Sequence, residues 1–272
     1  MKKIAAFYFS GTGNTWWVSQ RLAHSLKALG ATATFYSIEE LSIGSANRLI
    51  ADCNFVGFGY PVYGSDVPAI MKDFMGRLNP AEKDTFLYCS QWLWSGDGAR
   101  IGTEFIDRSF RVKWSEHFNM PNNVSVSIFR LPYTNDKDRI EKVLKKTDVK
   151  IQRFAQRIGQ RPFRRGFNIL SAMSGGLQRI PFRGTYERLR DDISVNQEKC
   201  TVCGYCIKIC PAGNLSLEGG GVKTAGRCII CLRCYSFCPA LAIQYKNKTH
   251  NRRDRPYQGP VEGFDPQCLL GK

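Results

Sequence analysis

Apolar runs and amphipathic stretches alternate along the first 158 residues. Short apolar runs bounded by turn residues predict β-strands at residues 4–9, 33–38, 55–59, 85–90 and within 112–118. Apolar residues at helical spacing predict helices at 14–29, 67–78, 99–110 and 136–158. Strands that alternate with helices indicate an α/β fold with a doubly wound, parallel, five-stranded sheet. Ligands of such sheets bind beyond the carboxyl ends of the strands.

Residues 159–190 break this alternation, because they are rich in Arg, Gly and aromatic side chains without a core pattern. We expect a basic connector packed between domains, or a docking face for an acidic redox partner. Interleaved arginines and aromatics would also suit nucleic acid, which is the less favoured interpretation. The residues concerned are Arg161, Phe163, Arg164, Arg165 and Phe167.

A glycine-rich loop with the sequence SGTGNT joins the first predicted strand to the first predicted helix. Its glycines let the backbone turn tightly and present N–H groups, and its polar side chains add donors. The positive end of the following helix also favours an anion. Neither the Gly-Lys-Ser/Thr of a Walker A motif nor the G-x-G-x-x-G of a dinucleotide site is present. The loop therefore predicts a bound phosphate, held by Ser10, Gly11, Thr12, Gly13, Asn14 and Thr15.

With this loop, residues 1–158 resemble flavodoxin, a family that grips the phosphate of FMN with a Ser/Thr-x-Thr-Gly-Asn-Thr sequence. The resemblance implies that the loops after the third and fourth strands enclose the isoalloxazine ring. Here both loops carry large flat side chains that could stack on such a ring. The candidate ring contacts are Tyr60, Pro61, Val62, Tyr63, Gly64, Ser90, Trp92, Trp94 and Gly96.

Eight of the eleven cysteines form an internal repeat with the spacing C-x2-C-x2-C-x3-C-P. Cys200, Cys203, Cys206 and Cys210 correspond to Cys228, Cys231, Cys234 and Cys238 at a constant offset of 28 residues. A whole ligand set that occurs twice at one offset indicates a repeated metal-binding unit. Zinc is disfavoured, because it needs four ligands and usually takes two C-x2-C pairs.

Residues 191–247 resemble a bacterial two-cluster ferredoxin, a small α+β domain in which the fourth cysteine of each run ligates the other cluster. The resemblance implies one [4Fe–4S] cluster at Cys200, Cys203, Cys206 and Cys238. It implies a second [4Fe–4S] cluster at Cys228, Cys231, Cys234 and Cys210. Such domains move single electrons at low potential.

The whole arrangement is similar to the flavodoxin–ferredoxin fusion family, found mostly in anaerobes. The resemblance implies an FMN domain at 1–158, the connector at 159–190, a two-cluster domain at 191–247 and a tail at 248–272. We expect a protein that relays low-potential electrons between FMN, two [4Fe–4S] clusters and external redox partners. The alternative is an FMN-dependent reductase of a small substrate with the ferredoxin domain as electron wire. No catalytic acid or base is predicted, so the question of an enzyme stays open.

The formal net charge is +16, and residues 151–190 carry nine Lys or Arg against one Asp or Glu. A basic surface steers acidic partners, so we expect redox proteins with acidic docking faces. No apolar run reaches the 18 residues or more that a membrane span requires. Clustered thiols without a secretion signal favour a cytoplasmic protein.

Overall fold

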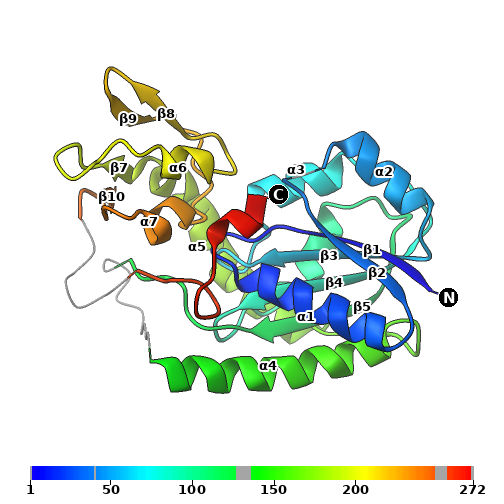
Figure 1. Ribbon diagram of the computed structural model, residues 1–272. Helices are drawn as coiled ribbons and strands as arrows, with labels where there is room; N and C mark the ends of the chain where they lie inside the picture. Colours follow the sequence, from blue (N-terminus) through cyan, green and yellow to red (C-terminus); the bar gives the residue numbers. More distant parts are fainter. Residues whose placement is uncertain (1, 40, 127–135, 249–255, 271–272) are drawn as a thin grey trace.

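The computed structural model describes residues 2–39, 41–126, 136–248 and 256–270. Its centre is a parallel sheet in the order β2-β1-β3-β4-β5-β6 (Figure 1). The predicted α/β fold is therefore confirmed, and the order 2-1-3-4-5 is that of flavodoxin-like folds. The strands are β1 Lys3–Tyr8, β2 Thr32–Ser37, β3 Phe55–Pro61, β4 Asp84–Gln91, β5 Arg111–Asn119 and β6 Phe163–Arg164.

Two helices cover each face of this sheet (Figure 1). On one face α1 (Asn14–Ala28) and α4 (Lys137–Arg157) pack over a core that includes Trp114 and Phe154. On the other face α2 (Ile43–Ala51) and α3 (Ala69–Gly76) cover a second core around Phe58. Burial of both faces explains why the strands are near-continuous apolar runs.

The helix expected at residues 99–110 is wrong in extent, since only the 3-10 helix η1 (Arg100–Glu104) forms there. Tyr60 donates hydrogen bonds to the carbonyls of Gly98 and Ala99. These carbonyls at the start of the segment are therefore engaged by a side chain and not by the amides of a continuing helix. Ile101, Ile106 and Phe110 are nevertheless buried, so their spacing reflects packing of an irregular segment.

The segment at 159–190 contains regular structure where only a connector was expected. Strand β6 pairs with β5, with Phe163 beside Trp114, so the sheet has six strands instead of five. Helix α5 then runs over Ile169–Asp191 and begins at Asn168, whose side chain accepts from the Ser171 amide. Three glycines and Pro181 lower the intrinsic helix propensity of α5, so tertiary contacts must stabilise it.

Residues 193–245 form a smaller unit beside the carboxyl ends of the sheet strands (yellow to orange in Figure 1). Its elements are β7 Ile193–Val195, α6 Tyr205–Lys208, β8 Leu215–Glu218, β9 Gly221–Thr224, α7 Arg233–Phe237 and β10 Ile243–Tyr245. Strand β7 pairs with β10, and β8 pairs with β9, both antiparallel.

The backbone of this unit repeats as its sequence does. Left-handed conformations occur at Val202 and Ile230, at Gly204 and Leu232, and at Gly213 and Leu241. Each pair is separated by the 28 residues of the cysteine repeat. Positive φ is costly for β-branched residues, so its recurrence at Val202 and Ile230 points to turns constrained by function.

The C-terminal segment ends in the 3-10 helix η3 (Pro266–Leu270) and returns to the start of α1 (red in Figure 1). The described part of the tail therefore packs against the sheet domain and the cysteine-rich unit. None of the helices within the described residues is long and apolar enough to cross a membrane.

Candidate functional site

A cavity of about 270 Å³ lies beyond the carboxyl ends of β1, β3, β4 and β5. Four of its walls are the segments at and after the ends of these strands, and a fifth comes from α5 and the second cysteine run. From the sequence-predicted site it includes Ser10, Gly11, Thr12, Asn14, Thr15, Pro61, Val62, Tyr63, Gly64, Ser90 and Trp92, together with the cysteine Cys231.

The loop between β1 and α1 is folded as an anion cradle. Gly13 is the N-cap of α1 with a φ of 104°, a conformation that favours glycine. The Ser10 hydroxyl oxygen accepts hydrogen bonds from the amides of Gly13 and Trp16, at 3.2 and 3.1 Å. It still has its own proton to donate into the cavity. The positive end of α1 therefore faces a buried polar loop that suits a phosphate.

Polar side chains of this loop also fasten its neighbours. The Thr12 hydroxyl accepts from Asn123 at 2.6 Å, and the Thr15 and Ser90 hydroxyls are 2.8 Å apart. The Asn14 amide donates to the Pro121 carbonyl at 3.0 Å. These bonds join the loops after β1, β4 and β5 into one rim around the cavity.

Three predicted ring contacts lie outside the cavity lining. Tyr60 is buried in the sheet core, because β3 continues through Pro61 and directs this side chain below the loop. Trp94 is 54% exposed on the surface. Gly96 packs against α5, where a Cβ would lie 2.3 Å from the Gly175 amide nitrogen.

Tyr63 supplies a test of whether a ligand fits this cavity. Its hydroxyl is buried and has no hydrogen-bond partner among the described residues. Burial raises the pKa of this phenol well above its ordinary value, so it is a neutral donor. A buried orphan donor indicates a missing polar partner. The aromatic Tyr63, the flat Trp92 and the anion cradle together fit a ligand with a ring at one end and a phosphate at the other.

Sequence reasoning missed part of the cavity. The loop after β5 contributes Pro121, Asn122, Asn123 and Val124. This loop could have been found from the rule that parallel strands present ligands at their carboxyl ends. No local signal marks the remaining residues, which depend on domain packing: Gln91, Phe182, Leu189, Ile230 and Leu232.

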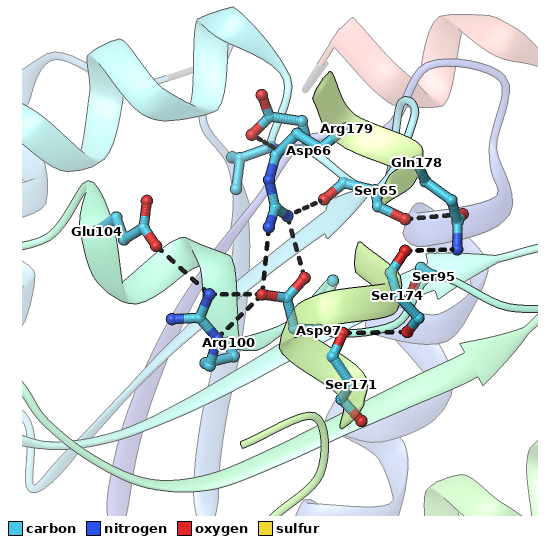
Figure 2. A network of polar contacts seen from close by, with 12 residues as sticks. Ser65, Asp66, Ser95, Asp97, Arg100, Glu104, Ser171, Ser174, Gln178 and Arg179 are labelled. Atoms are coloured by element: carbon cyan, nitrogen blue, oxygen red, sulfur yellow. Dashed lines mark hydrogen bonds and ion pairs between the residues drawn. The ribbon is translucent and has the colours of Figure 1, made fainter. Parts of the chain in front are cut away.

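Helix α5 holds the two predicted ring loops through two ion pairs, of which the buried one is drawn in Figure 2. Arg179 donates to the Asp97 carboxylate at 3.0 and 3.3 Å and to the Ser65 carbonyl at 2.7 Å. Asp97 is fully buried and also accepts from Arg100. One turn further, Arg183 donates to Asp66 at 2.7 Å. Two arginines of the basic segment 159–190 therefore fix these loops.

The eight cysteines of the repeat fall into two groups in space. Cys200, Cys203, Cys206 and Cys238 line one cavity. Burial, together with neighbouring Cys238, Cys200 and Cys203, raises the pKa of the Cys206 thiol to about 11. The last cysteine of the second run thus lies with the first three cysteines of the first run, as the resemblance to two-cluster ferredoxins implies. Among the described residues, no three His, Cys, Asp or Glu side chains converge closely enough to hold a single metal ion.

The second group is formed around the other run. Burial raises the pKa of the Cys234 thiol well above its ordinary value, and Cys231, Cys228 and Cys210 raise it further. Cys231 is the member of this group that lines the large cavity. A Cβ placed on Gly11 would lie 2.8 Å from the Cys231 carbonyl oxygen, so the two loops touch.

Arg233, between Cys231 and Cys234 in sequence, locks this contact. Its fully buried guanidinium donates to the carbonyls of Ser10 and Gly11 at 2.7 and 3.0 Å. It also makes bonds of 2.9 and 2.6 Å to the Glu39 carboxylate. Burial lowers the pKa of Arg233, but the bonds and charge of Glu39 outweigh this and raise it. The phosphate loop is therefore tied to the second cysteine run.

Residues 193–216 match the 4Fe-4S binding domain family Fer4. No curated protein sequence matches the chain.

Solved structures resemble the chain over slightly more than half its length. The rubredoxin oxygen:oxidoreductase of Desulfovibrio gigas is 16% identical, with a TM-score of 0.39, over 56% of this chain and 37% of that one. A flavodoxin from the domain Archaea is 14% identical, with a TM-score of 0.40, over 58% and 99%. The Streptococcus pneumonia TIGR4 flavodoxin is 14% identical, with a TM-score of 0.39, over 58% and 97%. The flavodoxin-like fold assignment rests on the strand order.

Proposed function

We propose that this chain is an electron-transfer protein that holds FMN in the large cavity and two [4Fe–4S] clusters at the two cysteine groups. FMN exchanges one or two electrons and each cluster exchanges one, so together they can relay low-potential electrons between external redox partners. One observation carries the proposal: Cys231 of the second cysteine run lines the same cavity as the phosphate loop.

The residues take the following roles in this proposal. The loop from Ser10 to Thr15 binds the FMN phosphate, and Tyr63 and Trp92 contact its ring. Cys210, Cys228, Cys231 and Cys234 hold the cluster nearer the cavity, which we name the near cluster. Cys200, Cys203, Cys206 and Cys238 hold the far cluster. The far cluster is then the natural exit toward a protein partner, because Cys203 is exposed whereas Cys231 is buried.

Three further expectations belong to the same proposal. The FMN domain comprises residues 1–158 and the two-cluster domain 191–247, with α5 bridging them. The protein is cytoplasmic, as expected for free thiols that bind clusters in a reducing compartment. Its redox partners present acidic faces, which the net charge of +16 favours.

The first experiment is anaerobic reductive titration with iron and flavin assays, monitored by optical and EPR spectroscopy. We expect about eight irons per chain, one FMN and interacting reduced clusters. Iron without flavin would contradict the FMN site, and about four irons would contradict the second cluster.

Two serine variants then test the order of the cofactors. Cys203→Ser and Cys231→Ser should each lose one cluster and keep FMN. After photoreduction of the flavin, the remaining cluster should be reduced rapidly in Cys203→Ser and slowly in Cys231→Ser. Equal rates in both variants would refute the assignment of the near cluster.

The alternative, an FMN-dependent reductase of a small substrate, is favoured by one observation. A second cavity of about 180 Å³ adjoins the first, because both are lined by Tyr63 and Phe182. Steady-state turnover with small organic acceptors tests it. Turnover of a small acceptor by the wild type that is lost together with the far cluster in Cys203→Ser would favour the reductase, with the clusters as its electron wire, over the relay.

A further inference from the structure

The first half of helix α5 turns its aliphatic side chains to solvent. Five aliphatic side chains are 62–77% exposed, and they lie in a sector about 100° wide. We name them the α5 stripe: Ile169, Leu170, Met173, Leu177 and Ile180. Single exposed apolar residues are ordinary, but a contiguous stripe of five marks an interaction site.

The aliphatic side chains face solvent because of the contacts that hold α5 in place. Its buried side consists of Ser171, Gly175 and Arg179. Ser171 and Gly175 pack against the loop that holds Gly96 and Asp97, and Arg179 pairs with Asp97 (Figure 2). With Arg179 paired to a fully buried carboxylate, α5 cannot rotate its stripe inward without leaving Asp97 short of a partner. The ion pairs therefore keep the stripe on the surface.

Further apolar surface lies on the loop that α5 touches. Leu93 is 63% exposed and Trp94 is 54% exposed, two residues before Gly96 in contact with α5. Trp is enriched where protein meets the boundary between lipid headgroups and acyl chains. Aliphatic residues on one helix face with a neighbouring Trp are typical of segments that lie in this boundary.

The charge just before the stripe is positive. Arg161, Arg164 and Arg165 are exposed just before α5, and no Asp or Glu occurs from residue 159 to 186. Of the acids that face α5, Asp66 and Asp97 are buried under it and paired with arginines, and the exposed Glu104 is paired with Arg100. A second copy would bring like charges together, whereas an anionic surface would be attracted.

We propose that the α5 stripe, with Leu93, Trp94 and the arginines before α5, docks the protein on an anionic phospholipid surface. The helix lies in the headgroup layer without spanning the membrane, its aliphatic side chains enter the acyl boundary, and the arginines contact phosphates. This proposal is independent of the redox chemistry proposed above, although it would place the electron relay at a membrane.

Co-flotation of the cofactor-loaded protein with vesicles tests the proposal. We expect binding to phosphatidylcholine mixed with phosphatidylglycerol, weakening with added salt, and little binding to phosphatidylcholine alone. Leu177→Glu should weaken binding by on the order of tenfold or more. Leu217→Glu is the matched control, since Leu217 is 59% exposed on β8 and should not matter. Unchanged iron and flavin contents would verify that each variant is folded.

A charge variant separates the two parts of the surface. Arg161→Gln with Arg164→Gln should reduce binding to the anionic vesicles about fivefold per arginine. No binding to these vesicles, or equal binding to both kinds, would overturn the proposal. A dimer in light scattering that Leu177→Glu dissociates would overturn it in favour of a second copy on the stripe.

Discussion

His117 shows how one residue supports the site from below. It is buried at the end of β5, and its Nε2 accepts a hydrogen bond from the Ala99 amide, which fixes the end of the loop after β4. Burial, together with the positive charges of Arg165 and Lys150, lowers the pKa of His117 from 6.5 to about 3. The folded protein therefore keeps this side chain neutral at every moderate pH.

Protonation of His117 should couple stability to pH. Its pKa is lower in the folded state, so its contribution is complete above pH 6.5 and is lost as the pH falls toward 3. From about pH 7.5 to about pH 5 the loss is about 2 kcal/mol. Urea unfolding at both pH values should show His117→Gln losing less stability than the wild type. His24→Gln, at an exposed position on α1, is the control and should match the wild type. An identical loss in His117→Gln would contradict the prediction.

At the residue scale, five of the six candidates of the phosphate loop line the cavity, whereas three of the nine candidate ring contacts lie outside it. Glycines and hydroxyls between a strand and a helix have few other uses, whereas four flat side chains in two loops are ambiguous. Which of Tyr60 and Tyr63 reaches the cavity depends on where β3 ends. The strand was expected to stop at residue 59, but it continues to Pro61, and this puts Tyr60 in the core.

Of the helices that the sequence did not predict, α2 and α5, the longer one is α5. Periodicity identifies a helix by the face it buries, and α5 buries Ser171, Gly175 and Arg179. Its stability comes from charge pairs with loops about 80 residues or more away in sequence, such as Asp97. No local sequence pattern can predict partners that lie so far away in the chain. The parallel sheet, by contrast, followed directly from the apolar runs of its strands.

Removing Arg179 should test whether this ion pair holds α5. Arg179→Met leaves the buried Asp97 with Arg100 alone, and we expect a loss of about 3 kcal/mol in the free energy of unfolding. Adding Asp97→Asn should recover part of that loss, because the two sites are coupled. Arg188→Met, at an exposed position on the same helix, is the control. Chemical denaturation of all variants gives the comparison. Additive losses in the double variant would show that the pair is not coupled.

At the scale of the whole molecule, several attachments join the sheet domain to the cysteine-rich unit. Those that the described residues show include the Arg233–Glu39 pair, helix α5, Val126 of the loop after β5 and the C-terminal tail. The two units could be predicted separately, because each has its own sequence repeat or alternation. Their mutual placement could not, since Arg233 has no signal in the sequence that distinguishes it from other arginines. That placement is what brings Cys231 to the cavity.

The C-terminal tail contacts both the sheet domain and the cysteine-rich unit through Phe264. Its ring packs on Trp16 of α1 and on Phe237 of α7, at 5.3 and 5.9 Å between centroids. It also covers Gly13, where a Cβ would lie 2.6 Å from its ring. Nearby, Tyr257 donates to Asn14 at 2.5 Å. The tail therefore braces the phosphate loop.

Loss of this brace should loosen the cofactor before it unfolds the protein. We expect Phe264→Ala to release flavin about tenfold faster, because its apolar contacts hold the phosphate loop closed. Flavin fluorescence after dilution measures the rate. Val261→Ala, in the same tail and 37% exposed, is the control and should leave the rate unchanged. Faster release with an unchanged unfolding midpoint would place the effect in the loop itself, since a general loss of stability would lower both. An unchanged release rate in Phe264→Ala would show that the phosphate loop holds its conformation without the tail.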